Sequence, residues 1–253
     1  MHFYLLASGS YGNSTVIKFK NATFLVDVGL NKKEFLSKLD SLDVSLKDID
    51  AVFVTHEHSD HIKGIKYVDI KKVYATKETL FPYQYNFIKP FQLLEIKGVK
   101  IVPIPISHDA ANGLGYVFDD GEESLVYLTD TGYVSKKVKP FLQNATHYIF
   151  ESNHDVEMLL RTERPFYLKK RILSDVGHLC NEDSAMILSE VIGDLTKTIT
   201  LAHISEDANT PQKVEEVVKD ILKQQGKDID KLDIQVAKRY DITKGGSLNE
   251  KDI

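Results

Sequence analysis

The sequence predicts an α/β (α+β) protein built as a four-layer αββα sandwich, with helices on the outer faces of two packed sheets. Short apolar runs typical of strands come in two blocks along the chain, and helical segments follow each block. Histidine or aspartate stands directly after several of these runs. No linker rich in Ser, Gly or Pro interrupts the sequence, so we expect one domain over residues 1–253 without an added cap domain.

The composition excludes several classes of protein. Hydrophobic residues make up 42% of the 253 residues and charged residues 27%, which excludes a mainly disordered chain. No apolar stretch approaches the roughly 18 residues of a membrane span, and the N-terminus does not resemble a signal peptide. The single cysteine, Cys180, excludes an intramolecular disulfide, so we expect a cytoplasmic protein without a membrane partner. The net charge of −5 argues against a generally basic coat for nucleic acid.

The first block begins with alternating or continuous apolar runs, which predict strands over residues 3–7, 15–19, 23–28 and 51–55. A turn of small residues over 8–14 follows the first strand, and Asn21-Ala22 forms a hairpin turn between the second and third. A short helix is expected over 32–39. Further strands are expected over 73–76, 92–96 and 101–106.

The second block begins with strands over 116–118 and 124–129, joined by a turn at Asp119-Asp120-Gly121. A helix over 135–143 and a strand over 148–150 are expected next. Asn181 suits the N-cap of a helix, and Thr210-Pro211 starts another that ends near residue 225. The remaining expectations are a charged helical stretch over 155–170 with a break at Pro165, strands over 199–202 and 235–238, and a frayed tail from about Gly245.

The sharpest motif is Thr-His-Glu-His-Ser-Asp-His over residues 55–61, directly after an apolar strand. In an extended segment alternate residues face the same side, so His56 and His58 are expected to face one cation together. Asp60 and His61 lie just beyond and are expected to face a second cation. A single histidine is more often an ordinary core or surface residue, as we expect for His2 and His147, but this density of ligands predicts a metal site.

Three further candidates each close an apolar strand: His108, Asp130 and His203. Each is weak by itself, because an aspartate after a strand is more often a turn residue. Together they complete two sites, in which Asp130 bridges the two cations. The predicted donor sets are His56, His58 and His108 for one cation, and Asp60, His61 and His203 for the other. These ligands suit zinc or manganese, with iron also possible.

This pattern resembles the metallo-β-lactamase fold superfamily, over residues 1 to about 240. Asp27, in Leu-Val-Asp-Val-Gly, matches the superfamily's first motif, which implies structural support of the histidine loop. The His-x-His-x-Asp-His motif follows, and the other ligands come in the expected order. Resemblance to the branch that processes tRNA 3′ ends implies that Glu151 and His178 form a proton shuttle.

Taken whole, the sequence is similar to bacterial metallo-hydrolases of the YycJ/WalJ type. The segments that carry this likeness include Leu-Ala-Ser-Gly-Ser, Ile-Ser-His-Asp-Ala, Glu-Ser-Asn-His-Asp, Gly-His-Leu-Cys-Asn and Leu-Ala-His-Ile-Ser. The resemblance implies a metal-dependent 5′→3′ DNA exonuclease linked to DNA repair. Cys180 is a departure, because serine is expected at that position.

Several residues outside the metal set are candidate substrate contacts: Ser10, Asn13, His154 and Asn181. His154 is equally well explained as a residue that starts a helix. The run Arg-Thr-Glu-Arg-Pro-Phe-Tyr-Leu-Lys-Lys-Arg over 161–171 combines five basic residues with Phe166 and Tyr167. Basic side chains attract the phosphates of a single-stranded DNA end, and aromatic side chains stack on its nucleobases. The alternative is a solvated helix face whose aromatics lie in the core.

We therefore expect an enzyme that hydrolyses phosphodiesters, in which two cations share a hydroxide tuned by Asp60 and Asp130. Glu151 orients His178, which protonates the leaving oxygen. One alternative is a small-molecule enzyme of the same fold, either a cyclic phosphodiesterase or a thioester or lactone hydrolase. A second is a metal-stabilised regulatory module.

Overall fold

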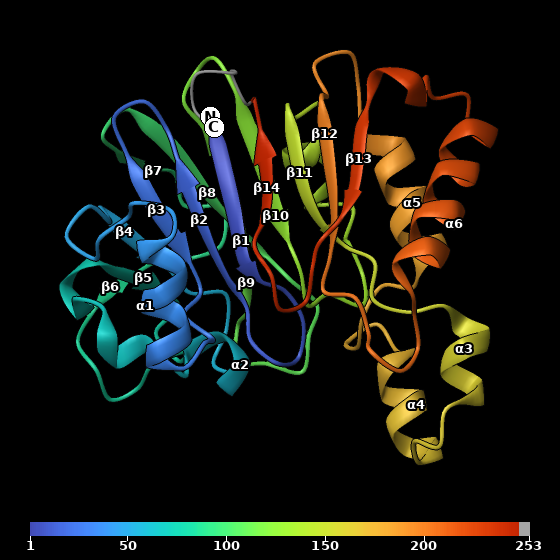
Figure 1. Ribbon diagram of the computed structural model, residues 1–253, viewed down its shortest axis with the longest axis horizontal. Helices are drawn as coiled ribbons and strands as arrows, with labels where there is room; N and C mark the ends of the chain where they lie inside the picture. The colour runs from blue at the N-terminus through green and yellow to red at the C-terminus, as the bar shows by residue number, and fades with distance from the viewer. Residues whose placement is uncertain (248–253) are drawn as a thin grey trace.

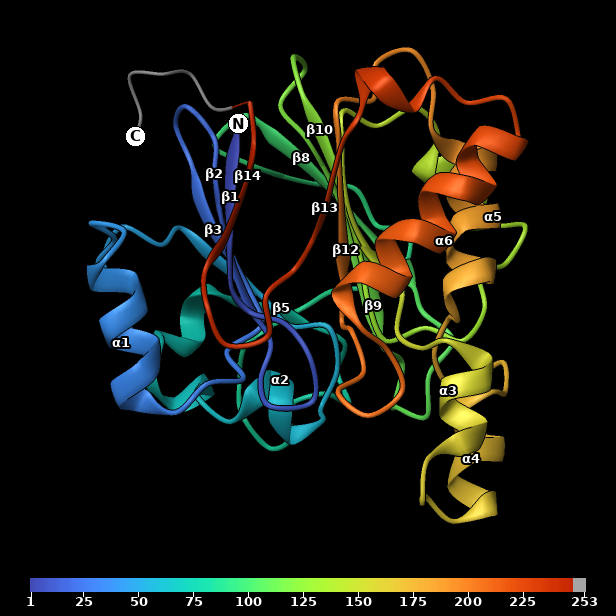
Figure 2. The same ribbon diagram turned by 45° about the vertical axis from the view of Figure 1, so that its right-hand side comes forward.

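Two seven-stranded β-sheets pack face to face, and helices cover their outer faces (Figure 1). The computed structural model describes residues 1–247. Figure 2 shows the layers edge-on, with α1 (Lys32–Asp40) outside the first sheet and α5 (Asn181–Val191) and α6 (Pro211–Gln224) outside the second. This is the predicted four-layer sandwich, and no cap domain is added within the described residues.

The first sheet has the strand order β14-β1-β2-β3-β4-β5-β6. Pairing is antiparallel from β14 to β3 and parallel from β3 to β6. Its strands are β1 (His2–Ala7), β2 (Ser14–Lys18), β3 (Thr23–Val26), β4 (Ala51–Phe53), β5 (Val73–Ala75), β6 (Asn86–Phe87) and β14 (Thr243–Gly246).

The second sheet has the strand order β13-β12-β11-β10-β9-β8-β7. The strands β10 to β13 run parallel, so their carboxyl ends meet at one edge of the sheet. Its strands are β7 (Leu94–Ile96), β8 (Val99–Pro105), β9 (Leu114–Asp119), β10 (Ser124–Leu128), β11 (His147–Glu151), β12 (Thr198–Ala202) and β13 (Asp233–Val236).

The apolar core is divided among the layers. Aromatic side chains such as Phe24, Phe53 and Phe118 fill the space between the sheets, and all three are fully buried. Phe35 and Leu39 pack α1 against the first sheet. Leu188 and Val218 pack α5 and α6 against the second. The sheets are therefore held rigidly, and the loops at their carboxyl edges have a fixed base.

Three short helices lie at the lower end of the sandwich in Figure 1: α2 (Ser59–Ile62), α3 (Val156–Arg161) and α4 (Phe166–Ile172). The last two project beyond the sheets and form what we call the α3–α4 arm, residues 156–172. Short 3₁₀ helices cover residues Ile65–Tyr67, Ile70–Lys72, Lys139–Leu142 and Ile229–Lys231. No helix within residues 1–247 is long and apolar enough to cross a membrane.

The predicted helix over 135–143 is wrong, because residues Lys139–Leu142 form only a 3₁₀ turn. Pro140 explains the difference, since its ring and missing N–H do not fit a helix interior. Gly245 and Gly246, expected in the frayed tail, pair with β1 instead. Gly245 is needed there because a side chain would collide with the Phe3 ring. The rest of the expected tail, residues 248–253, lies outside the described residues.

Candidate functional site

The predicted metal ligands lie close together, because most of them directly follow the ends of strands. His56 and His58 lie in the loop after β4, and Asp60 and His61 lie in α2, which follows at once. His108 follows β8, Asp130 follows β10 and His203 follows β12. Because β10 and β12 are parallel neighbours of β11, the residues after them emerge at the same edge of the second sheet.

Four overlapping groups of these side chains have possible ligand atoms within 4.8 Å of one another. They are His56 with His58 and His108; Asp60 with His61 and His203; His56 with His61 and Asp130; and Asp130 with Glu151, His178 and His203. The first two groups match the two predicted donor sets. The other two place Asp130 between them. The geometry therefore brings all seven predicted ligands into one cluster.

The unused atoms of this cluster fit divalent cations. His56 Nε2, Asp130 Oδ2 and His203 Nε2 are buried and have no hydrogen-bond partner within the described residues. Buried polar atoms without partners are costly, and they point to a bound species that would satisfy them. Imidazole nitrogens with carboxylate oxygens form the donor chemistry of zinc, manganese and iron sites.

The ring nitrogens away from the cluster are held by protein groups. His56 Nδ1 lies 3.0 Å from Thr55 Oγ1, and His108 Nδ1 lies 3.1 Å from the carbonyl oxygen of Gly177. Burial lowers the pKa of both histidines, so each imidazole is held neutral. A neutral ring anchored at Nδ1 presents Nε2 as a metal ligand.

Asp27 supports the histidine loop from behind. Its carboxylate lies 2.7 Å from His61 Nδ1 and accepts hydrogen bonds from the backbone and hydroxyl of Thr55, at 2.8 and 2.9 Å. Burial lowers the pKa of His61, but the Asp27 and Asp130 carboxylates outweigh burial and raise it to about 10. Without a cation this ring therefore carries a proton, which a bound cation would replace.

Two ligands of the cluster and Asp27, which supports it, have strained backbones. Asp27, Asp130 and His203 have φ angles of 59°, 57° and 57°, in the left-handed region that residues other than glycine rarely adopt. Such strain costs about 1–3 kcal/mol per residue and concentrates at functional sites. Each residue lies just after a strand, where the turn directs its side chain into the cluster.

Glu151, at the end of β11, links the cluster to His178. Glu151 Oε1 lies 2.8 Å from His178 Nδ1 and 3.0 Å from His203 Nδ1, and Oε2 accepts a hydrogen bond from Thr131 N at 2.7 Å. Burial raises the pKa of Glu151, but the His178 and His203 imidazoles outweigh burial and lower it to about 2. The carboxylate is therefore ionised, and it leaves His178 Nε2 directed away from it.

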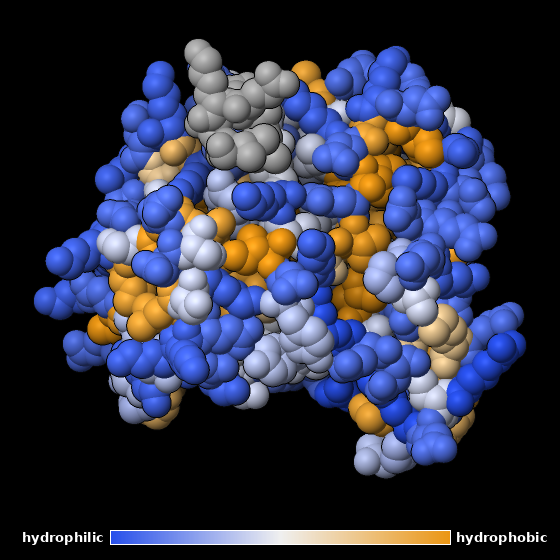
Figure 3. Space-filling model, viewed as in Figure 1, coloured by the Kyte–Doolittle hydropathy of each residue, from blue (hydrophilic) through white to orange (hydrophobic). Residues whose placement is uncertain are grey.

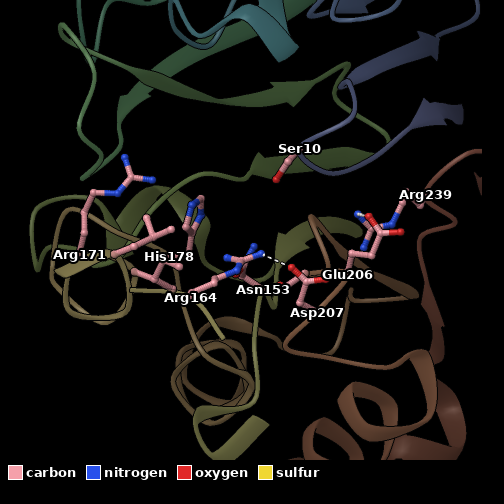
Figure 4. A pocket seen from close by; sticks show the side chains of 11 residues that line it. Ser10, Asn153, Arg164, Arg171, His178, Glu206, Asp207 and Arg239 are labelled. Atoms are coloured by element: carbon pink, nitrogen blue, oxygen red, sulfur yellow. Dashed lines mark hydrogen bonds and ion pairs between the residues drawn. The ribbon is translucent and has the colours of Figure 1, made fainter. Parts of the chain in front are cut away.

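His178 borders an open cavity of about 410 Å³ (Figure 4). Ser10 and Asn153 also line the cavity, together with three arginines. These are Arg164 and Arg171 from the α3–α4 arm and Arg239 from the loop after β13. The sequence identified Arg164 and Arg171 only as members of a basic run and missed Arg239, which has no local motif around it.

Among the predicted substrate contacts, Ser10 lines the cavity and is exposed. The other three are buried, and Asn13 and Asn181 make hydrogen bonds within the protein. Asn13 Nδ2 lies 3.0 Å from His61 Nε2 and 3.3 Å from Asp60 Oδ2, so it contacts the ligands rather than the opening. Asn181 accepts a hydrogen bond from Ser152 and donates one to Asn209. His154 is 1% exposed, does not line the cavity and has no hydrogen-bond partner for either ring nitrogen within the described residues, so its role as a substrate contact stays a prediction.

Cys180, not Asn181, is the N-cap of α5. Its Sγ accepts a hydrogen bond from Asp183 N at 3.4 Å. Serine is a preferred capping residue, so the cysteine here takes the role that the expected serine would have. Burial raises the pKa of the thiol to about 12, which keeps it protonated at neutral pH. The departure from the family pattern is thus explained by capping.

The aromatics of the arm are not in the core. Phe166 and Tyr167 are 77% and 75% exposed, which contradicts the interpretation that they pack inside. In Figure 3 the projecting arm carries hydrophobic side chains, drawn orange, among hydrophilic ones, drawn blue. Arg161 matches the solvated alternative, since it pairs with Glu157 on the exposed face of α3.

The fold and the donor cluster define a metallo-hydrolase class, and comparison with known proteins agrees. The family model described as "Beta-lactamase superfamily domain" matches residues 23–204. The chain therefore belongs to the beta-lactamase superfamily.

Two curated relatives are similar over most of their length. Exodeoxyribonuclease YycJ of Bacillus anthracis is 39% identical, over 89% of this chain and 90% of the relative. Exodeoxyribonuclease WalJ of Streptococcus pneumoniae is 37% identical, over 81% and 82%.

Solved structures share the fold. The metallo-beta-lactamase fold protein YhfI from Bacillus subtilis aligns with a TM-score of 0.70 at 20% identity, over 96% of this chain and 99% of that chain. A diphosphatase of the PhnP family has a TM-score of 0.66 at 18% identity, over 98% of both chains. Human tRNase Z, short form, has a TM-score of 0.64 at 14% identity, over 96% and 98%.

Proposed function

We propose that this chain is a metal-dependent phosphodiester hydrolase that acts as a 5′→3′ DNA exonuclease. The observation that carries the proposal is the Glu151–His178 pair, which joins the donor cluster to an arginine-lined cavity. A general acid beside a metal cluster suits an alkoxide leaving group, and arginines suit a phosphate backbone. The exodeoxyribonuclease names of the two curated relatives support DNA as the substrate.

The residues fit two divalent cations. One would be held by His56, His58 and His108, the other by Asp60, His61 and His203, with Asp130 shared between them. Zinc and manganese both suit these donors, and iron is also compatible. When bound, two such ions lower the pKa of a water molecule and neutralise charge that develops on the phosphate.

The chain's own residues orient the ligands and move the proton. Asp27 fixes the orientation of His61, and Asp60 and Asp130 set the charge that faces the attacking water. Glu151 Oε1 holds His178 through its Nδ1, at 2.8 Å. His178 Nε2 then donates its proton to the oxygen that leaves phosphorus. General acid catalysis of this kind contributes about 10²–10⁴-fold to rate.

Exposed aromatics give the DNA strand a place to stack. Phe166 and Tyr167 lie at the start of α4, on the same arm that brings Arg164 and Arg171 to the cavity. Stacking of bases on aromatic rings contributes about 1–3 kcal/mol per base and tolerates any sequence. We propose a DNA end as the substrate, a single domain as the acting unit, a role in DNA repair and the cytoplasm as the compartment.

A small cyclic phosphodiester is the second candidate substrate, because a cavity of about 410 Å³ also suits a single nucleotide. Apo-protein reconstituted separately with Zn²⁺ and Mn²⁺ distinguishes the two. We expect it to shorten DNA from the 5′ end, as followed with 5′-labelled and 3′-labelled strands. If bis(p-nitrophenyl) phosphate is cleaved while both labelled strands survive, the DNA proposal is wrong. If the 3′ label is released first, the polarity is wrong.

A further inference from the structure

Arginine is scarce in this chain and concentrated at one cavity. Four of the 32 basic residues are arginine: Arg161, Arg164, Arg171 and Arg239. All but Arg161 line the cavity beside His178, and no lysine of the described residues lines it. Arginine differs from lysine in its planar fork of donors, which grips a phosphate with two parallel hydrogen bonds. The placement therefore indicates phosphate recognition at this cavity, rather than general surface charge.

The arginines are held by acids that an incoming phosphate is able to replace. Arg164 pairs with Asp207 at 2.9 Å, and Arg239 pairs with Glu206 at 3.3 Å. The Asp207 and Glu206 side chains are 59% and 62% exposed, so these ion pairs contribute little. Arg171 is also paired, with Asp109. A dianionic terminal phosphate offers each guanidinium a stronger partner than an exposed carboxylate.

The position of His178 determines which part of the substrate this cavity holds. In Figure 4 the His178 ring lies between Arg171 and Arg164, and Ser10 faces it from the opposite side of the opening. His178 is the proposed proton donor, so the cavity lies on the side of the leaving oxygen. During hydrolysis the bond from phosphorus to O3′ breaks and a bond from phosphorus to the water oxygen forms. O3′ takes the proton of His178, and the water supplies the proton that restores it.

In a 5′→3′ exonuclease the fragment that carries this O3′ is the terminal nucleotide. We propose that the cavity is a terminal-nucleotide pocket in which Arg164, Arg171 and Arg239 grip the 5′-phosphate of the DNA end. This inference rests on the proposed function and names the end chemistry that the site selects. The volume of about 410 Å³ lies within the range of pockets for small ligands.

The test compares two strands of the same sequence, both 3′-labelled with fluorescein, one with a 5′-phosphate and the other with a 5′-hydroxyl. The wild-type protein is expected to cleave the phosphorylated strand with a kcat/KM at least about tenfold higher, the effect of one good charged hydrogen bond. Thymidine 5′-monophosphate is expected to inhibit competitively, whereas thymidine and thymidine 3′-monophosphate are expected to inhibit far less.

Variants separate bidentate recognition from charge. The variant R164K/R171K/R239K keeps the charge but loses the fork, so its preference for the 5′-phosphate is expected to fall toward one. The control is R161A, which removes the one arginine outside the cavity and is expected to keep the preference. Hydrolysis of bis(p-nitrophenyl) phosphate, which has no terminal phosphate, reports that each variant is folded and loaded with metal.

The outcomes are distinguishable. Equal cleavage of the two strands by the wild-type protein, or an unchanged preference in the triple lysine variant, would overturn the proposed 5′-phosphate pocket. The exonuclease proposal would still stand. Hydrolysis of bis(p-nitrophenyl) phosphate without cleavage of either strand would overturn both. A triple variant that loses p-nitrophenyl phosphodiesterase activity is replaced by the three single lysine variants, each of which is expected to reduce the preference in part.

Discussion

The donor cluster and the arginine cavity lie side by side but are built in opposite ways. The cluster is buried or half-buried, and two of its ligands, Asp130 and His203, follow strand ends in strained conformations that the two packed sheets hold in place. The cavity is open, and two of its arginines come from a projecting arm. The rigid sheet edge thus holds the candidate metal ligands in place. The proposed binding site for the DNA end is instead formed by arginines whose exposed acidic partners a phosphate is able to replace.

The largest effect is expected at the shared carboxylate. In D130N the buried carboxylate that faces His61 through Oδ2 and His203 through Oδ1 loses its charge, so both donor sets are weakened. We expect metal content to fall and hydrolysis of both DNA and bis(p-nitrophenyl) phosphate to drop below detection. Metal content is measured by mass spectrometry and folding by circular dichroism. A folded D130N protein with full metal content and activity would show that Asp130 is not a ligand.

A selective loss is expected for H178A. Removal of the proton donor should lower kcat on DNA by about 10²–10⁴-fold, because an alkoxide leaves poorly without a proton. The same variant should lose far less on bis(p-nitrophenyl) phosphate, since p-nitrophenolate leaves without protonation. Metal content should stay unchanged, because His178 lies outside both proposed donor sets. Equal losses on the two substrates would contradict the role of His178 as acid.

The arm is expected to act on affinity rather than on the chemical step. In F166A/Y167A two exposed rings are removed, and the loss of one stacked base, at about 1–3 kcal/mol, predicts weaker binding of single-stranded DNA by about one to two orders of magnitude. Fluorescence anisotropy measures the affinity. F87A, which removes an exposed ring from β6, is the matched control. An unchanged Kd for the double variant would mean that the strand takes another path.

Asp27 tests whether the rigidity of the cluster matters for metal binding. D27N keeps the shape and tolerates the positive φ of this position, but it removes the charge behind His61. Loss of such a supporting group lowers metal affinity by about 10–100-fold. Competition with a chromophoric chelator measures this change independently of turnover. A metal affinity of D27N equal to that of the wild type would mean that the charge of Asp27 does not support metal binding.

The difference between the donor cluster and the arginine cavity also explains which site residues could be predicted from the sequence. His56 to His61 form a local motif, and His108, Asp130 and His203 each close an apolar run, so the sequence identified them together as candidate ligands. Arg239 stands alone in the sequence and reaches the cavity only through the tertiary fold. The basic run around Phe166 and Tyr167 suited either a DNA-binding surface or a helix face with its aromatics in the core, and only the projection of the arm from the sheets shows that these rings are exposed. Residues that act through tertiary placement carry no local signal.

Substitution of Cys180 is expected to have the smallest effect. Because Cys180 lies two residues after the proposed acid His178, its variants test whether this loop contributes to the reaction only through His178. The buried thiol is protonated and its Sγ caps α5, so we expect no part for it in the reaction. C180S keeps a capping oxygen, and its activity should equal wild type with a melting temperature that is equal or higher. C180A removes the cap and should cost about 1 kcal/mol in the free energy of unfolding, measured by urea titration. Loss of turnover in a stable C180S protein would place the thiol in the chemistry, because the hydroxyl preserves the cap and changes only the sulfur.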